Sequence, residues 1–192
     1  GGGQLAAEAA CFNVGLTEQI PTGRLNHTAS IRGTGNFAEC RRQIRALLNL
    51  GTECLSLPCS MNGVHQPLVA GVPFYAGRTF YFTAKGLGLL KEDGGAGNSP
   101  TPSQIAAAGI VQCAKPFAAI QADEYARNFC FASAYISNVL EAMGFTPETK
   151  QIKYVDTIDG QPFGWARGAQ LYLNSMVELV GVTMPAKVNT AM

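Results

Sequence analysis

Charged side chains are scarce in this sequence. Of its 192 residues, 14 are Lys or Arg and 13 are Asp or Glu, which gives a formal net charge of +1. A balance this close to neutral provides no basic surface for nucleic acid or for an anionic membrane. Hydrophobic residues make up 47% of the chain, which excludes an intrinsically disordered protein. We therefore expect a folded domain that has no nucleic-acid partner.

Long apolar runs are also absent. No stretch reaches membrane-spanning length, and no signal-peptide pattern opens the chain. The length suits one domain with a proper core. Because the chain begins Gly1-Gly2-Gly3 without a Met, we interpret it as an excised or processed piece of a larger protein. Its first residues, 1–10, are then an N-terminal extension or a cloning remnant.

Histidine is rare, and this limits the chemistry. His27 and His65 are the only two, and neither lies near a second metal-ligating cluster. Asp156 and Asp159 flank a turn, and Asp123 marks a helix junction. None of these residues forms a convincing metal cluster, so we predict no metal site in the chain.

The sequence has an even number of cysteines. They are Cys11, Cys40, Cys54, Cys59, Cys113 and Cys130. Asn26-His27-Thr28 is also a glycosylation acceptor site. Together these features favour an oxidising compartment. Six cysteines allow 15 pairings, which the sequence alone leaves open. Cys54 and Cys59, with Pro58 between them, suit a small covalent staple, since a zinc knuckle needs a second Cys/His pair.

Hydrophobic periodicity predicts a helix-rich α/β fold with few strands. Asn36 is a good N-cap for a helix that ends before Gly51, and Thr101-Pro102 with Gln104 opens another. Further helices and strands follow from spacing. The predicted helices cover residues 76–90, 129–143 and 163–180, and the predicted strands cover residues 151–157 and the end of a strand at 30–32.

Several motifs occur together in one order. They are Gly33-Thr34-Gly35-Asn36-Phe37 with Cys40, the block Cys54–Pro67, Phe74-Tyr75 leading to Thr79-Phe80-Tyr81-Phe82, Asn128-Phe129-Cys130, and Gly164-Trp165-Ala166-Arg167-Gly168. With these motifs the chain resembles the nucleoside triphosphate diphosphohydrolases, the apyrase or ectonucleotidase family. The resemblance covers nearly the whole chain from Cys11 onward. It places the chain in the C-terminal portion of such an enzyme.

The resemblance implies the fold and the function. These enzymes have an actin-like, RNase H-like fold of two lobes, and they use Ca²⁺ or Mg²⁺ to hydrolyse nucleoside tri- and diphosphates. Their phosphate loops and catalytic Glu lie upstream of this segment, so the metal ligands are not in this chain. Asp93-Gly94-Gly95-Ala96-Gly97 is similar to one of those loops, but no Val or Ile precedes it over residues 84–90. We interpret it as a surface loop.

The resemblance also assigns a division of the chain. Residues 11–160 would form the second lobe, which carries the nucleobase, and residues 161–192 a C-terminal helix that returns to the first lobe. Gly164, Trp165 and Gly168 belong to an apyrase signature that packs the lobes together. Without the first lobe, this helix is a source of oligomerisation, and we expect the chain alone to be inactive.

Specific residue roles are implied in the same way. The family pattern pairs Cys11 with Cys40, Cys54 with Cys59, and Cys113 with Cys130. Two aromatic side chains enclose the nucleobase, at positions that match Phe82 and Phe129. An Arg near the base in some members corresponds to Tyr125. By pattern alone Phe82 and Phe129 also suit an ordinary core, so both interpretations stay open.

Three functions remain. The first is the nucleobase-side part of an apyrase, located outside the cell, at its surface or in the lumen of the secretory pathway, with its own N-terminal lobe and nucleoside tri- or diphosphates as partners. The second is a secreted, disulfide-stapled binding or adhesion module without catalysis. The third is an unrelated disulfide-stapled structural domain.

Overall fold

The computed structural model describes residues 5–21, 28–91, 98–162 and 164–180. The chain divides into two compact units, Gly1–Val155 and Asp156–Met192. Among the described residues, the first unit contains most of the helices and strands, and the second contains a hairpin and one helix.

A three-stranded mixed sheet opens the first unit. Its strands are β1 (Leu5–Ala9), β2 (Thr17–Pro21) and β3 (Thr28–Gly33). β3 lies in the middle, parallel to β1 and antiparallel to β2. The range 1–10, which the sequence suggested as an extension, therefore includes a paired edge strand. The predicted strand end at residues 30–32 lies within β3.

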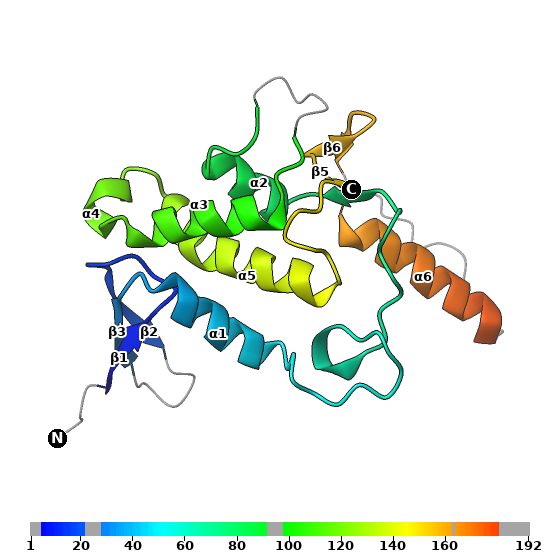
Figure 1. The fold of residues 1–192 in the computed structure, drawn as a ribbon, viewed down its shortest axis with the longest axis horizontal. Coiled ribbons are helices and arrows are strands. Elements are labelled where there is room, and N and C mark those ends of the chain that lie inside the picture. Colours follow the sequence, from blue (N-terminus) through cyan, green and yellow to red (C-terminus); the bar gives the residue numbers. More distant parts are fainter. Residues whose placement is uncertain (1–4, 22–27, 92–97, 163, 181–192) are drawn as a thin grey trace, which may run out of the picture. The chain divides into compact units, whose positions relative to one another are not determined.

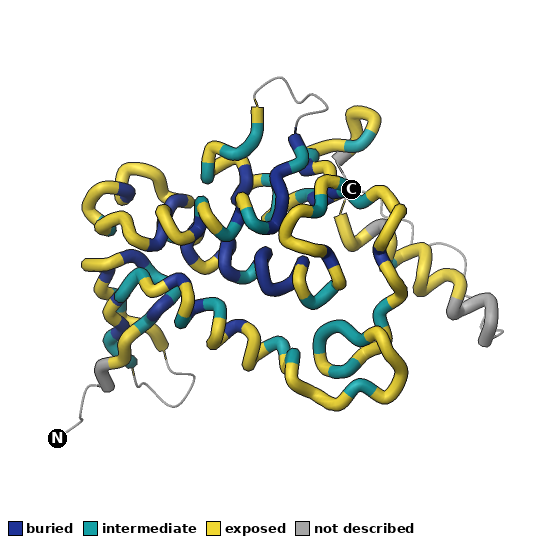
Figure 2. The backbone as a smooth tube through the Cα atoms, viewed as in Figure 1, coloured by how far each residue is buried: buried dark blue, intermediate teal, exposed yellow. Residues whose placement is uncertain are grey.

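Four helices build the body of this unit, and α5 (Phe129–Ala142) lies at its centre. α5 contacts α1 (Phe37–Leu47), α2 (Thr79–Gly86) and α3 (Pro102–Ala114), as Figure 1 shows. Figure 2 shows that α5 is buried along most of its length. The fold is mixed α/β and rich in helix, which agrees with the sequence prediction at this level.

The starts of α1 and α3 follow from their first residues. The side-chain oxygen of Asn36 accepts the backbone N–H of Glu39 at 3.1 Å. Thr101 and Gln104 form a reciprocal capping box, with Pro102 in the first turn of α3. These contacts satisfy N–H groups that have no partner inside the helix. Both caps are the ones that the sequence predicts.

Polar side chains inside α5 have hydrogen-bond partners, which allows the helix to be buried. The Ser133 hydroxyl donates to the Phe129 carbonyl at 2.7 Å, and the Ser137 hydroxyl donates to the Ser133 carbonyl at 2.8 Å. The Asn138 side-chain amide donates to the Arg41 carbonyl of α1 at 2.9 Å. Because buried polar groups without partners are costly, these bonds are needed in so enclosed a helix.

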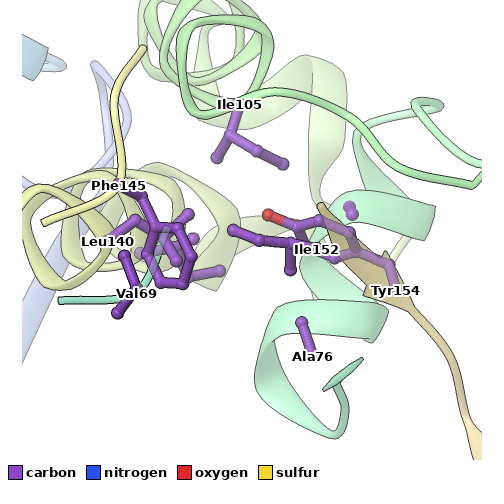
Figure 3. Close-up of a cluster of buried hydrophobic side chains, with 9 residues drawn as sticks. Val69, Ala76, Ile105, Leu140, Phe145, Ile152 and Tyr154 are labelled. Carbon is purple, nitrogen blue, oxygen red and sulfur yellow. The ribbon is translucent and has the colours of Figure 1, made fainter. Parts of the chain in front are cut away.

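Short elements complete the first unit. They are the 3₁₀ helices η1 (Met61–Gly63) and η2 (Ala126–Asn128), the helix α4 (Phe117–Ile120), and the parallel strand pair β4 (Phe74–Ala76) and β5 (Ile152–Tyr154). Figure 3 shows how side chains of α3, α5 and β5 meet in the larger apolar core, among them Ile105, Leu140 and Ile152.

The helix predicted over residues 76–90 is wrong in its extent. Ala76 ends β4, and α2 covers only Thr79–Gly86. Arg78 precedes α2 with φ at 51°, and Gly88 has φ at 72°. Neither value fits a right-handed helix, so the backbone turns at both places. The predicted strand at 151–157 is likewise shorter, because β5 ends at Tyr154.

In the second unit, residues 156–162 and 164–180 form a small hairpin and one helix. β6 (Thr157–Ile158) pairs with β7 (Gln161–Pro162) in antiparallel fashion. Asp159 and Gly160 form the turn, both with positive φ. α6 spans Trp165–Val180, which agrees with the helix predicted over residues 163–180.

Candidate functional site

A cavity of about 730 Å³ lies between α2, the segment around η2, and the start of α5. Two smaller cavities of the same unit have volumes of about 270 and 350 Å³. All three residues assigned from the sequence to a nucleobase pocket line the large cavity. The cavity, called the aromatic pocket below, is lined by Arg78, Thr79, Phe82, Thr83, Lys85, Gly86, Asp123, Tyr125, Asn128, Phe129 and Ala132.

Phe82 supplies an accessible aromatic face. It lies in α2, and 47% of it is exposed. The ring of Tyr81 meets it edge-on, with ring centroids 5.3 Å apart. The Lys85 ammonium lies over the other aromatic ring, 5.9 Å from the centroid of Tyr81. A flat ring that is half open to water, with cations nearby, is suited to stacking against a planar ligand.

Phe129, unlike Phe82, is largely buried, and it belongs both to the lining of the pocket and to the core. Only 9% of it is exposed, and it clusters with the buried Ile120 and Ala126. Its ring lies so close to Gly86 that a Cβ atom on that residue would overlap it. The two interpretations that the sequence left open for Phe129 are therefore compatible. The backbone of α2 and the ring of Phe129 approach closely because residue 86 has no side chain.

The segment from Asp123 to Asn128 forms the polar wall. The Asp123 carboxylate accepts the backbone N–H of Tyr125 at 2.9 Å. Tyr125 is 63% exposed. A hydrogen bond to the Glu124 carboxylate, together with the charge of that group, raises the pKa of the Tyr125 phenol. Tyr125 therefore stays neutral to a higher pH than an ordinary tyrosine does.

Arg127 belongs to the same segment but takes no part in lining the pocket. Its guanidinium donates to the Glu18 carboxylate of β2 at 2.6 Å. The positive charge at the pocket comes instead from Arg78 and Lys85, while Asp123 contributes one negative charge. Such a mixture can attract a phosphate chain and still offer an acceptor to N–H or O–H groups of a ligand.

Sequence reasoning did not find these polar lining residues. Arg78, Lys85 and Asp123 belong to no motif, and Asn128 belongs to the motif Asn128-Phe129-Cys130 but had no role assigned in the pocket. Gly86 had a usable signal, because a glycine one helical turn after Phe82 indicates a close approach by another group. The charged residues become neighbours only when α2 packs on α5.

The six cysteines form three disulfides. Cys11 pairs with Cys40, Cys54 with Cys59, and Cys113 with Cys130. These are the pairs that the resemblance implies. Cys59 also forms an isolated antiparallel bridge with His65, and the turn at Asn62 and Gly63 has positive φ at both residues. That region is a stapled hairpin-like loop.

The remaining predicted residues belong to other parts of the chain. Gly164, Trp165 and Gly168 belong to the second unit, where Trp165 is 85% exposed. The acceptor Asn26 and the Gly-rich run at residues 93–97 lie outside the described residues.

Metal ligands do not gather in the described part of the chain. Within the described ranges no group of three or more His, Cys, Asp or Glu side chains is placed to hold an ion. The described residues therefore offer no such cluster for the Ca²⁺ or Mg²⁺ that the resemblance implies for the whole enzyme. Among the helices so described, none combines the length and the apolar character needed to cross a bilayer.

Comparison with known proteins identifies the family. The model of the GDA1/CD39 (nucleoside phosphatase) family matches residues 4–189. The chain is 32% identical over 150 residues to a protein named Probable apyrase 3 of Arabidopsis thaliana, covering 73% of this chain and 29% of that protein. It is 30% identical over 155 residues to ectonucleoside triphosphate diphosphohydrolase 1 of Bos taurus, covering 77% and 29%.

A third relative is the guanosine-diphosphatase of Candida albicans, 26% identical over 154 residues that cover 71% of this chain and 24% of the relative. The chain thus matches less than a third of the length of these relatives. The chain belongs to the GDA1/CD39 nucleoside phosphatase family, which confirms the resemblance noted from the sequence.

Proposed function

We propose that this chain is the nucleobase-binding part of an apyrase-type hydrolase of nucleoside tri- and diphosphates. One observation carries the proposal. Phe82 lies far from Tyr125 and Phe129 in the sequence, and yet these three residues, all assigned by family resemblance, line a single cavity. The base would stack on the accessible ring of Phe82 while Phe129 and Gly86 form the floor.

The cations of the pocket support the same orientation. Arg78 lies immediately before α2 and Lys85 lies in α2, and both line the pocket together with Phe82. A nucleotide whose base lies against Phe82 could direct its phosphates toward these charges. In the described part of the chain, neither cation has a carboxylate partner within 4 Å. Both can therefore attract an anionic ligand.

Hydrolysis would belong to the whole protein and not to this chain alone. The described residues hold no metal cluster, and the relatives are more than three times as long as the matched segment. We propose that the preceding part of the parent protein forms the other lobe of an actin-like fold. That lobe would supply the phosphate loops, the general base and the ligands of Ca²⁺ or Mg²⁺.

The C-terminal unit has a separate role in this proposal. Trp165, Leu171 and Tyr172 of α6 are 85%, 72% and 64% exposed. Large exposed apolar side chains on one helix are typical of an interface. We propose that α6 and the signature Gly164, Trp165 and Gly168 pack on the preceding lobe, and that self-association takes its place when this lobe is absent. A blue shift of Trp165 fluorescence on mixing with that lobe would support the packing. An unshifted spectrum together with a monomer by light scattering would contradict both.

The compartment follows from covalent structure. The chain holds three disulfides, which are stable in oxidising surroundings and rare in reducing cytosol. We propose that the parent protein works outside the cell, on its surface, or in the secretory lumen. Glycosylation at Asn26 would accompany this location, and mass spectrometry of protein from a secreting host tests it.

Nucleotide binding by the chain is the decisive experiment. Titration calorimetry with ADP, GDP and UDP should detect binding, and Phe82→Ala should weaken it by about tenfold, because base stacking contributes roughly 1–3 kcal/mol. Phe131→Ala is the matched control. Phe131 is 44% exposed, stacks on Tyr135 and does not line the aromatic pocket. Equal affinities of the two variants would contradict the pocket assignment.

Phosphate release separates the enzyme from the adhesion module. We expect no release by the chain alone and release from nucleoside diphosphates, with Ca²⁺ or Mg²⁺, after assembly with the preceding lobe. An assembled protein that binds nucleotides without cleaving them would favour the non-catalytic binding module.

A further inference from the structure

We propose that Gln112, which does not line the aromatic pocket, is the positioning residue for Phe129 and for the turn that precedes it. Its role in nucleotide binding rests on the function proposed above, while its role in ordering the turn does not. Three parts of the fold, α3, η2 and the start of α5, meet at a single carbonyl oxygen.

That oxygen belongs to Ala126. The side-chain amide of Gln112 donates to it at 3.1 Å, and the backbone N–H of Phe129 donates to it as well. The second bond closes η2 and fixes the direction in which α5 begins. Gln112 therefore contacts the same acceptor that sets the backbone of Phe129.

Gln112 is itself held firmly. It lies near the end of α3 and is 4% exposed. Its side-chain oxygen accepts the Lys115 ammonium at 2.9 Å. Its backbone carbonyl accepts the side-chain amide of Asn13 at 2.6 Å. A side chain fixed at both ends has lost its rotamer freedom already, so it can hold a turn at little further entropic cost.

The adjacent disulfide does not replace this contact. Cys113, which follows Gln112, forms a disulfide with Cys130, which follows Phe129. This disulfide keeps α3 and α5 together. The η2 turn lies on the N-terminal side of Cys130 and includes none of the bridged atoms. The hydrogen bond from Gln112 is what ties the turn to α3. Tyr125 and Asn128, which belong to the polar wall, lie in the same short segment as Ala126.

Two variants of Gln112 test the proposal. Gln112→Met removes both side-chain hydrogen bonds and keeps the length of the side chain. Gln112→Glu keeps an acceptor for Lys115 and removes the donor to Ala126. The matched control is Gln151→Met, because the Gln151 amide donates to the Val69 carbonyl at 2.7 Å and lies outside the aromatic pocket. If Gln112→Met does not fold, Gln112→Glu carries the test.

Two measurements give the answer. In hydrogen exchange, both Gln112 variants should lose protection at the amide of Phe129 by about tenfold or more, while amides in the middle of α5 keep theirs. In calorimetry, both should bind ADP roughly fivefold more weakly than the unmodified chain. Gln151→Met should alter neither quantity, although it loses an equivalent bond.

The outcomes are separable. Unchanged exchange at Phe129 in a folded Gln112 variant would overturn the proposal. If exchange changes and the unmodified chain binds no nucleotide, the positioning role stands and the proposed function fails. If exchange changes and ADP affinity does not, Gln112 orders a turn that the ligand does not use, and the role in binding is overturned.

Discussion

The ring of Phe129 occupies the space that a side chain at Gly86 would need. Gly86 ends α2 without positive φ, so its backbone accommodates alanine. The glycine is therefore required by this contact and not by its backbone conformation. Gly86→Ala should displace the Phe129 ring and weaken ADP binding by about tenfold, which calorimetry measures. Gly51→Ala is the control, since nothing lies near a Cβ atom at Gly51. Equal binding by both variants would show that the position of this ring is unimportant.

Phe82 and Phe129 should differ sharply in their effects on stability. Phe129 is 9% exposed and Phe82 is 47% exposed. Phe129→Ala creates a cavity in the core and should lower the free energy of unfolding by about 3–5 kcal/mol. Phe82→Ala should change it by about 0.5 kcal/mol or less. Urea denaturation measures both values, and a large loss in Phe82→Ala would reassign that residue to the core.

Each disulfide should stabilise the folded state by an amount that grows with the length of the loop it closes. Cys113 and Cys130 are 17 residues apart, and Cys54 and Cys59 are 5 apart. Loop entropy then gives about 3 kcal/mol for the first bridge and about 2 kcal/mol for the second. Double Cys→Ser variants, compared by thermal unfolding, should follow this order. Thiol titration of the denatured, unreduced protein should find no free thiol, and six free thiols would contradict all three bridges.

The ionisation of Tyr125 should depend on Glu124. The Glu124 carboxylate raises the pKa of the Tyr125 phenol, so Glu124→Gln should lower it toward the ordinary tyrosine value. A group whose pKa is raised by folding stabilises the folded state below its unfolded pKa and loses this contribution as pH rises through the folded pKa. Ultraviolet difference titration against Tyr125→Phe measures the change. Identical curves with and without Glu124 would contradict the pairing.

Much of the fold follows from local rules in the sequence. Asn36 and Thr101 are caps that work through their immediate neighbours, so the starts of their helices were predictable. The extent of α2 was not. Its limits depend on the backbone at Arg78 and Gly88, and apolar residues continue on both sides, so that periodicity alone suggested a longer helix.

The candidate site divides in the same way. Phe82, Phe129 and Tyr125 were assigned through resemblance to a family, and the structure lines one cavity with them. Arg78, Lys85 and Asp123 could not be assigned, because a charged residue usually lies at the protein surface without a specific role. The sequence could not predict that Gln112 and Phe129 donate to the same Ala126 carbonyl, since Gln112 reaches this segment only through long-range packing.

The enclosure of α5 determines how the pocket can be lost. Three helices pack on α5, and its first residue is Phe129. Helices enclosed on several sides usually open only when the whole unit unfolds. Ligand affinity and global stability are then thermodynamically linked, so that a nucleotide bound at Phe129 would raise the melting temperature of the entire first unit and not of the pocket alone.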